Sequence, residues 1–183
     1  MTTIALTGHT SGLGEIIAGH FTVEGFSRGN GYDLSTPEGC EKLLHYIDHY
    51  DVFINNAFPY VSLGIADGMF RQTELLYAVY DRWVDTDRLI INIGSNTSDG
   101  IKKNAWPYSA AKASLDKASE QLCYQKNSCF VSNLKLGFVD TQRVKDSFPD
   151  EKHLPSSCVV EGIEYIIKQW QAGVRVKELC LLP

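Results

Sequence analysis

Short apolar runs recur along the chain, separated by segments with the period of a helix. We expect strands at 3–7, 21–27, 51–55, 88–95, 130–136 and 178–182, where apolar and β-branched residues are concentrated. The runs at 51–55 and 88–95 are mostly apolar and end in small or polar residues. This pattern is typical of parallel strands that are covered on both faces.

The segments between these runs place apolar residues three and four positions apart, so each segment predicts a helix with one apolar face. The residues on these faces are Leu13, Ile16 and Ile17; Cys40, Leu43, Leu44 and Ile47; Leu76, Val79, Tyr80 and Trp83; Ala111, Leu115, Ala118 and Leu122, within a helix over 108–125; and Val159, Ile163, Ile166 or Ile167, and Trp170. Ser35, with Glu38 three residues later and Pro37 between them, predicts the start of the second helix.

The alternation of strand and helix continues to the end of the chain. It favours an α/β fold with a doubly wound, Rossmann-type parallel sheet in three α/β/α layers. A chain of 183 residues is long enough for one well-buried core and short for two, so we expect a single domain over 1–183. Ligands of such folds bind beyond the carboxyl ends of the strands, so the residues that follow the strands are the candidates for function.

Composition narrows the class of partner. The formal charge of −5 argues against nucleic acid, whose binding relies on a basic surface. No apolar segment approaches the ~20 residues that cross a bilayer and no signal-peptide pattern opens the chain, so we expect a cytoplasmic protein with no membrane partner. The five cysteines are scattered and form no C-x-x-C pair, which predicts reduced thiols rather than a disulfide framework or a zinc knuckle.

The segment TGHTSGLG (7–14) directly follows the first predicted strand. Gly8, Gly12 and Gly14 permit a tight turn and a close approach of the backbone to a pyrophosphate, and the next helix directs its free N–H groups at the anion. The spacing alone also fits a plain turn between strand and helix, but the strand before it and the helix after it favour a dinucleotide site. His9, inside this loop, can assist with phosphate charge or cap the turn.

Arg28 follows the second predicted strand, twenty positions after Gly8. A fold that selects NAD usually has an acidic residue there, which binds the ribose 2′-hydroxyl. A guanidinium instead pairs with a 2′-phosphate, so we expect NADP(H) to be preferred, with NAD(H) as the alternative cofactor. The other interpretation of Arg28 is a solvated surface charge.

Tyr108 and Lys112 are four residues apart in a predicted helix, so both side chains project from the same face. An ammonium group beside a phenol favours the phenolate and lowers its pKa from ~10 toward the range of a general acid/base. Ser95, at the end of a strand, can donate a hydrogen bond to a carbonyl oxygen. These groups suit hydride transfer from a nicotinamide, for which the protein supplies a proton and orientation. Taken individually, Tyr108, Lys112 and Ser95 each fit an ordinary structural role. Their combination with the glycine loop favours a catalytic role.

Together these motifs resemble those of the short-chain dehydrogenases/reductases over nearly the whole chain. The segment 7–14 resembles the family's TGxxxGxG loop, NNA (55–57) its NNAG, and Ser95, Tyr108 and Lys112 its catalytic residues at their usual spacing. The resemblance implies that Tyr108 exchanges the proton, that Lys112 holds the ribose hydroxyls and lowers the tyrosine pKa, and that Ser95 orients the substrate. It also implies that LGFVDT (136–141), which resembles the family's PG-x-x-x-T segment, closes over the nicotinamide.

Together with the glycine loop and Arg28, the residues that the resemblance implies give expected cofactor contacts along the whole ligand. They are Gly8, His9, Thr10, Ser11, Gly12, Leu13 and Gly14 in the loop; Arg28, Asp33 and Leu34 at the adenosine end; Asn55, Asn56 and Ala57 in the NNA segment; Tyr108 and Lys112; and Gly137, Val139 and Thr141 at the nicotinamide end.

The chain departs from the family at several positions. Leu136 replaces the proline of PG-x-x-x-T, and Phe58 replaces the glycine of NNAG. Residues 57–91 contain no asparagine to complete the family's catalytic tetrad. The alternative substitutes for it are Asp67, Gln72 and Thr73.

The chain is also short for this family. Only 29–31 separate the second strand from YDLS (32–35), which leaves no room for a further crossover helix. The segment after Thr141 is brief for a substrate lid, which fits a small or exposed substrate. His45 and His49 fit a solvated helix face better than a metal site, because only two good ligands lie close together.

We therefore expect an NADP(H)-dependent oxidoreductase that interconverts a small-molecule carbonyl and an alcohol, with Tyr108 as general acid/base assisted by Lys112 and Ser95, and with no metal. One alternative is an NADP(H)-binding regulatory or structural protein with weak or no catalysis. Another is an enzyme that epimerises or dehydrates nucleotide sugars, which generally has a larger C-terminal domain. The resemblance implies a homodimer or homotetramer built partly on the helix 108–125.

Overall fold

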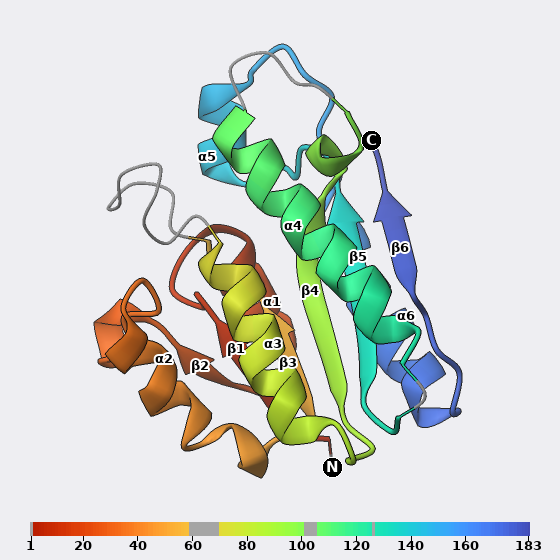
Figure 1. The fold of residues 1–183 in the computed structure, drawn as a ribbon. Helices are drawn as coiled ribbons and strands as arrows, with labels where there is room; N and C mark the ends of the chain where they lie inside the picture. The colour runs from red at the N-terminus through yellow and green to blue at the C-terminus, as the bar shows by residue number, and fades with distance from the viewer. Residues whose placement is uncertain (1, 59–69, 101–105, 126) are drawn as a thin grey trace.

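Six parallel strands form one sheet in the order β2-β1-β3-β4-β5-β6 (Figure 1). The computed structural model describes residues 2–58, 70–100, 106–125 and 127–183. The strands are β1 Ile4–Thr7, β2 Val23–Phe26, β3 Val52–Asn55, β4 Leu89–Ser95, β5 Phe130–Leu136 and β6 Glu178–Leu181. The parallel sheet predicted from the alternating pattern is confirmed.

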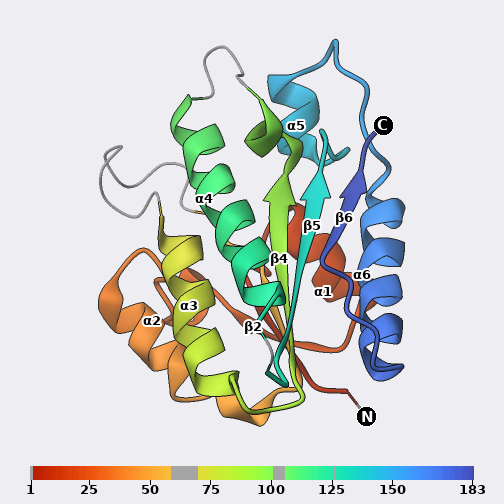
Figure 2. The ribbon, with the colours of Figure 1, turned by 45° about the vertical axis from the view of Figure 1, so that its right-hand side comes forward.

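Helices cover both faces of the sheet and give three layers (Figures 1 and 2). The α-helices are α1 Gly12–His20, α2 Pro37–Leu44, α3 Arg71–Trp83, α4 Trp106–Cys123, α5 Gln142–Ser147 and α6 Ser156–Gln171, and the 3-10 turns are η1 Arg28–Asn30, η2 Ile47–His49 and η3 Asn96–Asp99. Helices α1 and α6 pack on one face, whereas α2, α3 and α4 pack on the other. Figure 2 shows α5 beyond the carboxyl end of β5, on neither face.

Alternate residues of each strand face the two helical layers. In β3, Phe53 joins the cluster under α2, α3 and α4, while Val52 and Ile54 join the cluster under α1 and α6, and all three are fully buried. Trp83 at the end of α3 is also fully buried. Burial of apolar surface on both faces is the main stabilising contribution, and it explains why the central strands β3 and β4 are mostly apolar.

The chain changes direction across the sheet between β1 and β3. Strand β1 pairs with β2 on one side and with β3 on the other, and α2 connects β2 to β3. A crevice opens at such a topological switch point, which is where nucleotides bind in doubly wound folds. Among the described residues no strand lies beyond β2, in keeping with the short connection in the sequence.

One local prediction needs correction, and one short helix was not predicted. Helix α2 begins one residue later than expected: its N-cap is Thr36, whose Oγ1 accepts a 3.1 Å hydrogen bond from the Gly39 N–H. Ser35 instead binds the carboxylate of Asp33. The short helix α5 was not predicted, because its six residues carry no apolar periodicity. No helix within the described ranges is long and apolar enough to cross a membrane.

Candidate functional site

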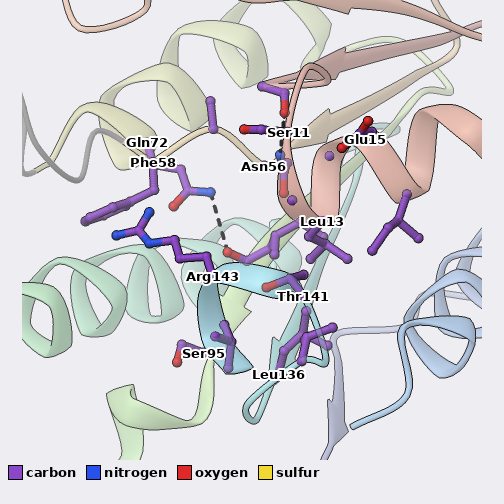
Figure 3. A pocket seen from close by; sticks show the side chains of 18 of the residues that line it. Ser11, Leu13, Glu15, Asn56, Phe58, Gln72, Ser95, Leu136, Thr141 and Arg143 are labelled. Atoms are coloured by element: carbon purple, nitrogen blue, oxygen red, sulfur yellow. Dashed lines mark hydrogen bonds between the residues drawn. The ribbon is translucent and has the colours of Figure 1, made fainter. Parts of the chain in front are cut away.

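A cavity of about 1610 Å³ extends along the carboxyl ends of the strands. Its wall includes Gly8 after β1, Arg28 after β2, Asn56 after β3 and Ser95 at the end of β4. The segment after β5 and the helix α5 complete it, and Figure 3 shows Leu136 and Thr141 there. The cavity therefore coincides with the crevice expected at the switch point.

Thr7 joins the ends of β1 and β3 beneath the glycine loop. Its Oγ1 accepts hydrogen bonds of 2.9 Å from the backbone N–H groups of both Asn56 and Ala57. The Asn56 side chain returns a 2.9 Å hydrogen bond from Nδ2 to the Thr7 carbonyl oxygen. These contacts hold the loop and the NNA segment at one fixed separation, so the two walls of the cavity are positioned together.

The glycines of the loop are required for two different reasons, backbone conformation and packing. Gly8 and Gly12 have φ values of 71° and 56°, a left-handed conformation that other residues rarely adopt. Gly14 is required by packing, because a Cβ atom there would lie 2.0 Å from the Gly8 carbonyl oxygen. Helix α1 can thus start directly against the loop, and the N–H groups of its first turn have no intrahelical partners. Ser11, the N-cap of α1, makes no side-chain capping hydrogen bond.

His9 and Asn55 do not line the cavity, although both were expected to contact a cofactor. The His9 ring covers Gly25 of β2, where a Cβ atom would lie 2.2 Å from His9 Cγ. Asn55 is fully buried, and its Nδ2 donates 2.9 Å hydrogen bonds to the Gln72 carbonyl oxygen and to Asn92 Oδ1. Both side chains therefore support the cavity wall from behind. The other expected contacts, from Gly8 to Thr141, lie on the wall itself.

The end of the cavity beyond β2 carries two arginines. Arg28 lies in η1, a turn held by Asn30, whose side chain binds the Ser27 N–H and the Gly25 carbonyl oxygen. Arg71, in the first turn of α3, also lines the cavity and is paired with Glu74 at 2.6 Å. No sequence motif indicated Arg71, because the sequence does not show where the start of α3 lies relative to β2.

Asp33 lies on the same part of the wall, but its carboxylate is already engaged. Asp33 Oδ1 accepts hydrogen bonds from the Ser35 hydroxyl at 2.6 Å and from the Ser35 N–H at 3.1 Å. The hydrogen bond from the Ser35 side chain, more than the nearby charge of Arg28, lowers the pKa of Asp33. The carboxylate therefore stays ionised beside the guanidinium.

Ser95 ends β4 and starts the turn η3. Its Oγ accepts hydrogen bonds from the Thr97 N–H at 3.3 Å and from the Thr97 hydroxyl at 3.0 Å. A hydroxyl group has one proton to donate, and two incoming hydrogen bonds from Thr97 leave that proton for another acceptor. Ser95 is buried at the cavity wall, so a ligand oxygen in the cavity is such an acceptor. Thr97 was not singled out in the sequence.

Tyr108 and Lys112 extend from the first turns of α4 into the same cavity. The Lys112 Nζ lies 5.6 Å from the centre of the Tyr108 ring and 5.1 Å from the centre of the Phe58 ring. Phe58, which stands where the family has glycine, packs its ring at 85° to that of Tyr108. Ser95, Tyr108 and Lys112 thus line the same cavity.

Lys112 is buried, with 3% of its surface exposed. Its Nζ donates hydrogen bonds of 2.8 Å to Gln72 Oε1 and 2.7 Å to the Ile93 carbonyl oxygen. Both acceptors are neutral, and burial lowers the pKa of Lys112 to about 7. Desolvation disfavours the charged form of an amine, so Lys112 titrates close to neutral pH.

Of the three candidate substitutes for the missing tetrad asparagine, Gln72 is the one that contacts Lys112. Of the other two, Asp67 lies outside the described residues. Thr73 faces elsewhere on α3, and its buried hydroxyl has no hydrogen-bond partner in the described parts of the chain. Sequence reasoning named Gln72 but had no basis for choosing it, since the choice depends on how α3 is rotated against β4.

No protein-family model matches the sequence, and no curated protein matches it. Many solved structures match the fold. One is a 4-hydroxyisoleucine dehydrogenase complexed with NADH, at 20% identity and a TM-score of 0.75, covering 98% of this chain and 96% of the other. Another is the closed form of a serine dehydrogenase complexed with NADP+, at 19% identity and a TM-score of 0.77, covering 99% and 95%.

A third match is a short-chain dehydrogenase from Sphingobium yanoikuyae in complex with NADPH, at 19% identity and a TM-score of 0.75. It covers 100% of this chain and 88% of the other. At such identities the likeness concerns the fold. Over nearly its whole length, the chain has the fold of the short-chain dehydrogenases.

Proposed function

We propose that the protein is an NADP(H)-dependent oxidoreductase that interconverts a carbonyl and an alcohol by hydride transfer. One observation carries this proposal: Ser95, Tyr108 and Lys112 line the same cavity as the glycine loop. A nucleotide site without reactive groups, or reactive groups without a nucleotide site, would fit a different function. Here the two occur together in the cavity at the carboxyl ends of the strands.

The residues present fit a dinucleotide. Beside Gly12 there is open space, since a Cβ atom there would meet no atom within 4 Å. The first turn of α1 offers backbone N–H groups and a positive dipole end to a pyrophosphate. The structures of similar fold named above contain NADH, NADP+ or NADPH, which supports the same class of cofactor here. When bound, the nicotinamide would supply or accept the hydride.

In this proposal Ser95 and Tyr108 act on the oxygen of the substrate. The Ser95 hydroxyl, oriented by Thr97, donates a hydrogen bond to a carbonyl oxygen and holds it in place. The Tyr108 hydroxyl gives its proton to that oxygen during reduction and takes it back during oxidation. Positioned proton transfer of this kind contributes about 10²- to 10⁴-fold to a rate.

Lys112 acts through its charge and its remaining N–H group. An ammonium has three donors, and Gln72 and Ile93 accept two of them. The third donor is available to a ribose hydroxyl or to the Tyr108 oxygen. In this proposal the ammonium supports Tyr108 and the cofactor through this donor, so turnover depends on Lys112 being protonated.

The preference for NADP(H) rests on the charge at the far end of the cavity. Arg28 and Arg71 both line this end, and a 2′-phosphate carries the negative charge that guanidinium groups bind well. Asp33 contributes one negative charge there, which its hydrogen bonds to Ser35 hold in place. Because Arg71 is already paired with Glu74, the proposed preference rests mainly on Arg28.

A binding protein without turnover is the second candidate function, and Phe58 is the observation that favours it. The Phe58 ring contacts Tyr108, with ring centres 5.2 Å apart, where the family has only a hydrogen atom. A side chain of this size reduces the room beside the tyrosine. The intact set of Ser95, Tyr108 and Lys112 supports the enzyme instead.

Titration with NADPH and NADH, followed by a screen of carbonyl compounds, tests the proposal. We expect NADPH to bind more tightly than NADH, and at least one carbonyl to be reduced with consumption of NADPH. Tight binding of NADPH without turnover in a broad screen would favour the second candidate. Failure to bind either nucleotide would refute both.

A further inference from the structure

Lys112 depends on one side chain for its position. Apart from Gln72, the hydrogen-bond acceptor at Nζ is a backbone carbonyl, that of Ile93. No carboxylate in the described ranges is paired with this ammonium group. The titratable group that faces it is Tyr108 on its own helix, and Gln72 faces it from α3. The side-chain amide of Gln72 thus stands where many buried lysines have an acidic partner.

The orientation of the Gln72 amide is determined by its own partners. Its Nε2 donates a 2.6 Å hydrogen bond to the Asn55 carbonyl oxygen and a longer one, 3.4 Å, to the Ile93 carbonyl oxygen. An amide turned the other way would place its oxygen against these two acceptors and its nitrogen against an ammonium donor. Oε1 therefore has to face Lys112.

The backbone of Gln72 is held as well, by a buried polar chain beneath α3. Asn55 Nδ2 donates to the Gln72 carbonyl oxygen and to Asn92 Oδ1, and Asn92 Nδ2 donates to Ser119 Oγ at 3.0 Å. Asn55 and Asn92 are directly paired across β3 and β4. This chain ties the first turn of α3 to the sheet and to α4. Gln72 is consequently a fixed acceptor, 4% exposed, and not a mobile surface amide.

We propose that Gln72 is a positioning residue: with the Ile93 carbonyl it occupies two donors of the Lys112 ammonium and directs the third into the cavity. This inference rests on the proposed function, in which that donor reaches the cofactor or Tyr108. Residues 57–91 contain no asparagine that could complete the family's catalytic tetrad. In this proposal Gln72, on α3, supports Lys112 instead. The neutral acceptor also leaves the lysine without a compensating negative charge.

Two substitutions separate the acceptor from the rest of the side chain. Gln72→Met keeps the length and removes the acceptor, so we expect kcat to fall by about 10- to 100-fold through misplacement of Lys112, with a smaller change in KM. Gln72→Glu keeps an oxygen and adds a negative charge, which raises the pKa of Lys112 by about 1 to 3. The alkaline limb of the kcat profile then moves to higher pH. Gln121→Met, at an exposed position of α4, is the matched control and is expected to change neither property.

A second measurement, the pH dependence of the free energy of unfolding, tests the role of Gln72 without requiring turnover. The free energy of unfolding of the unliganded protein depends on pH wherever Lys112 loses its proton on folding. In Gln72→Glu the rise of stability with pH above neutrality is expected to shrink, because the folded pKa of Lys112 moves toward its unfolded value. If no carbonyl is reduced by the wild type, the proposed function fails, but this measurement still tests Gln72.

Clear results would overturn the inference. One is a Gln72→Met enzyme with kcat within about twofold of the wild type, a difference of less than about 0.5 kcal/mol. Another is a Gln72→Glu variant whose kcat profile and unfolding show the pH dependence of the wild type. Should Gln72→Met fail to fold, Gln72→Glu decides. Gln72→Glu also places an oxygen against the Asn55 carbonyl oxygen, so should it fail to fold as well, the smaller Gln72→Ala decides by the same kcat criterion.

Discussion

The ring of Phe58 packs edge-to-face against the ring of Tyr108, with ring centres 5.2 Å apart. The same Phe58 ring has the Lys112 Nζ 5.1 Å from its centre. Edge-to-face aromatic pairs contribute about 0.5–1.5 kcal/mol beyond the area that they bury. Phe58 thus both stabilises the proposed acid/base pair and occupies space beside it.

Phe58→Ala is expected to open this space and to loosen Tyr108. We predict a loss of about 1–3 kcal/mol in the free energy of unfolding, since part of the ring is exposed and the cost stays below that of a core phenylalanine. We also predict that kcat/KM for a bulky ketone rises relative to that for a small one. Thermal unfolding and paired kinetic measurements check this. Phe70→Ala, at an exposed phenylalanine before α3, is the control, and equal ratios in the two variants would contradict the prediction.

Gly14→Ala is expected to destabilise the loop strongly, because its Cβ would lie 2.0 Å from the Gly8 carbonyl oxygen. A shift of the backbone is required to relieve this contact, and NADPH affinity should fall with it. Gly19→Ala in the same helix meets no atom within 4 Å and is expected to stabilise by about 0.5–1 kcal/mol. Urea denaturation of the two variants measures the contrast. Similar effects in both would show that α1 does not depend on contact with the loop.

Arg28→Ala is expected to weaken NADPH binding by about tenfold, or 1.4 kcal/mol, and to leave NADH binding nearly unchanged. The reason is that only the 2′-phosphate of NADPH needs the guanidinium. Fluorescence titrations with both nucleotides measure the difference. Lys168→Ala, at an exposed lysine of α6, controls for net charge. An equal loss of affinity for NADH would mean that Arg28 contacts a part common to both cofactors.

Tyr108→Phe is expected to abolish turnover, since the phenyl ring has no proton to exchange, while NADPH affinity changes little. A loss of about 10²-fold or more in kcat corresponds to removal of a general acid/base. Steady-state kinetics and a nucleotide titration on the same sample check both parts. Activity equal to that of the wild type in this variant would refute the proposed mechanism.

Lys112→Met tests the protonation of the buried lysine. Burial lowers the pKa of Lys112 to about 7, whereas an unfolded lysine titrates near about 10.4. Between these pH values the unfolded state holds the proton and the folded state does not, so the stability of the wild type rises with pH there. Below this window both states are protonated and the stability contributed by this group is constant.

The wild type is therefore expected to gain stability relative to Lys112→Met as pH increases through this window, by at most about 1.4 kcal/mol per pH unit. Urea denaturation of both proteins at several pH values measures the difference. Lys168→Met, at an exposed lysine, is expected to show no such trend. A difference between wild type and Lys112→Met that does not vary with pH would mean that the lysine stays charged when buried.

Much of the architecture was predictable from local patterns. The apolar runs around Phe53 and Ile91 identified strands covered on both faces, and α6 was evident from the period of its apolar residues. Short-range patterns are informative here because burial on both faces of a parallel sheet requires continuous apolar runs. Smaller features escaped this reasoning: α5 has no apolar face, and the cap of α2 is Thr36, since Ser35 binds Asp33 instead.

The sequence by itself determined which residues carry the candidate chemistry, because Ser95 ends a predicted strand and Tyr108 and Lys112, four residues apart, share a helix face. Tertiary structure alone decided what surrounds them. The choice of Gln72 over Thr73 depends on how α3 is rotated against β4. The placement of Phe58 against Tyr108 depends on where the segment after β3 lies beside the start of α4. The position of His9 is also a tertiary effect: its ring packs on β2 because Gly25 has no side chain to exclude it. Such contacts join residues far apart in the chain, and the packing that creates them leaves no periodic signal in the sequence.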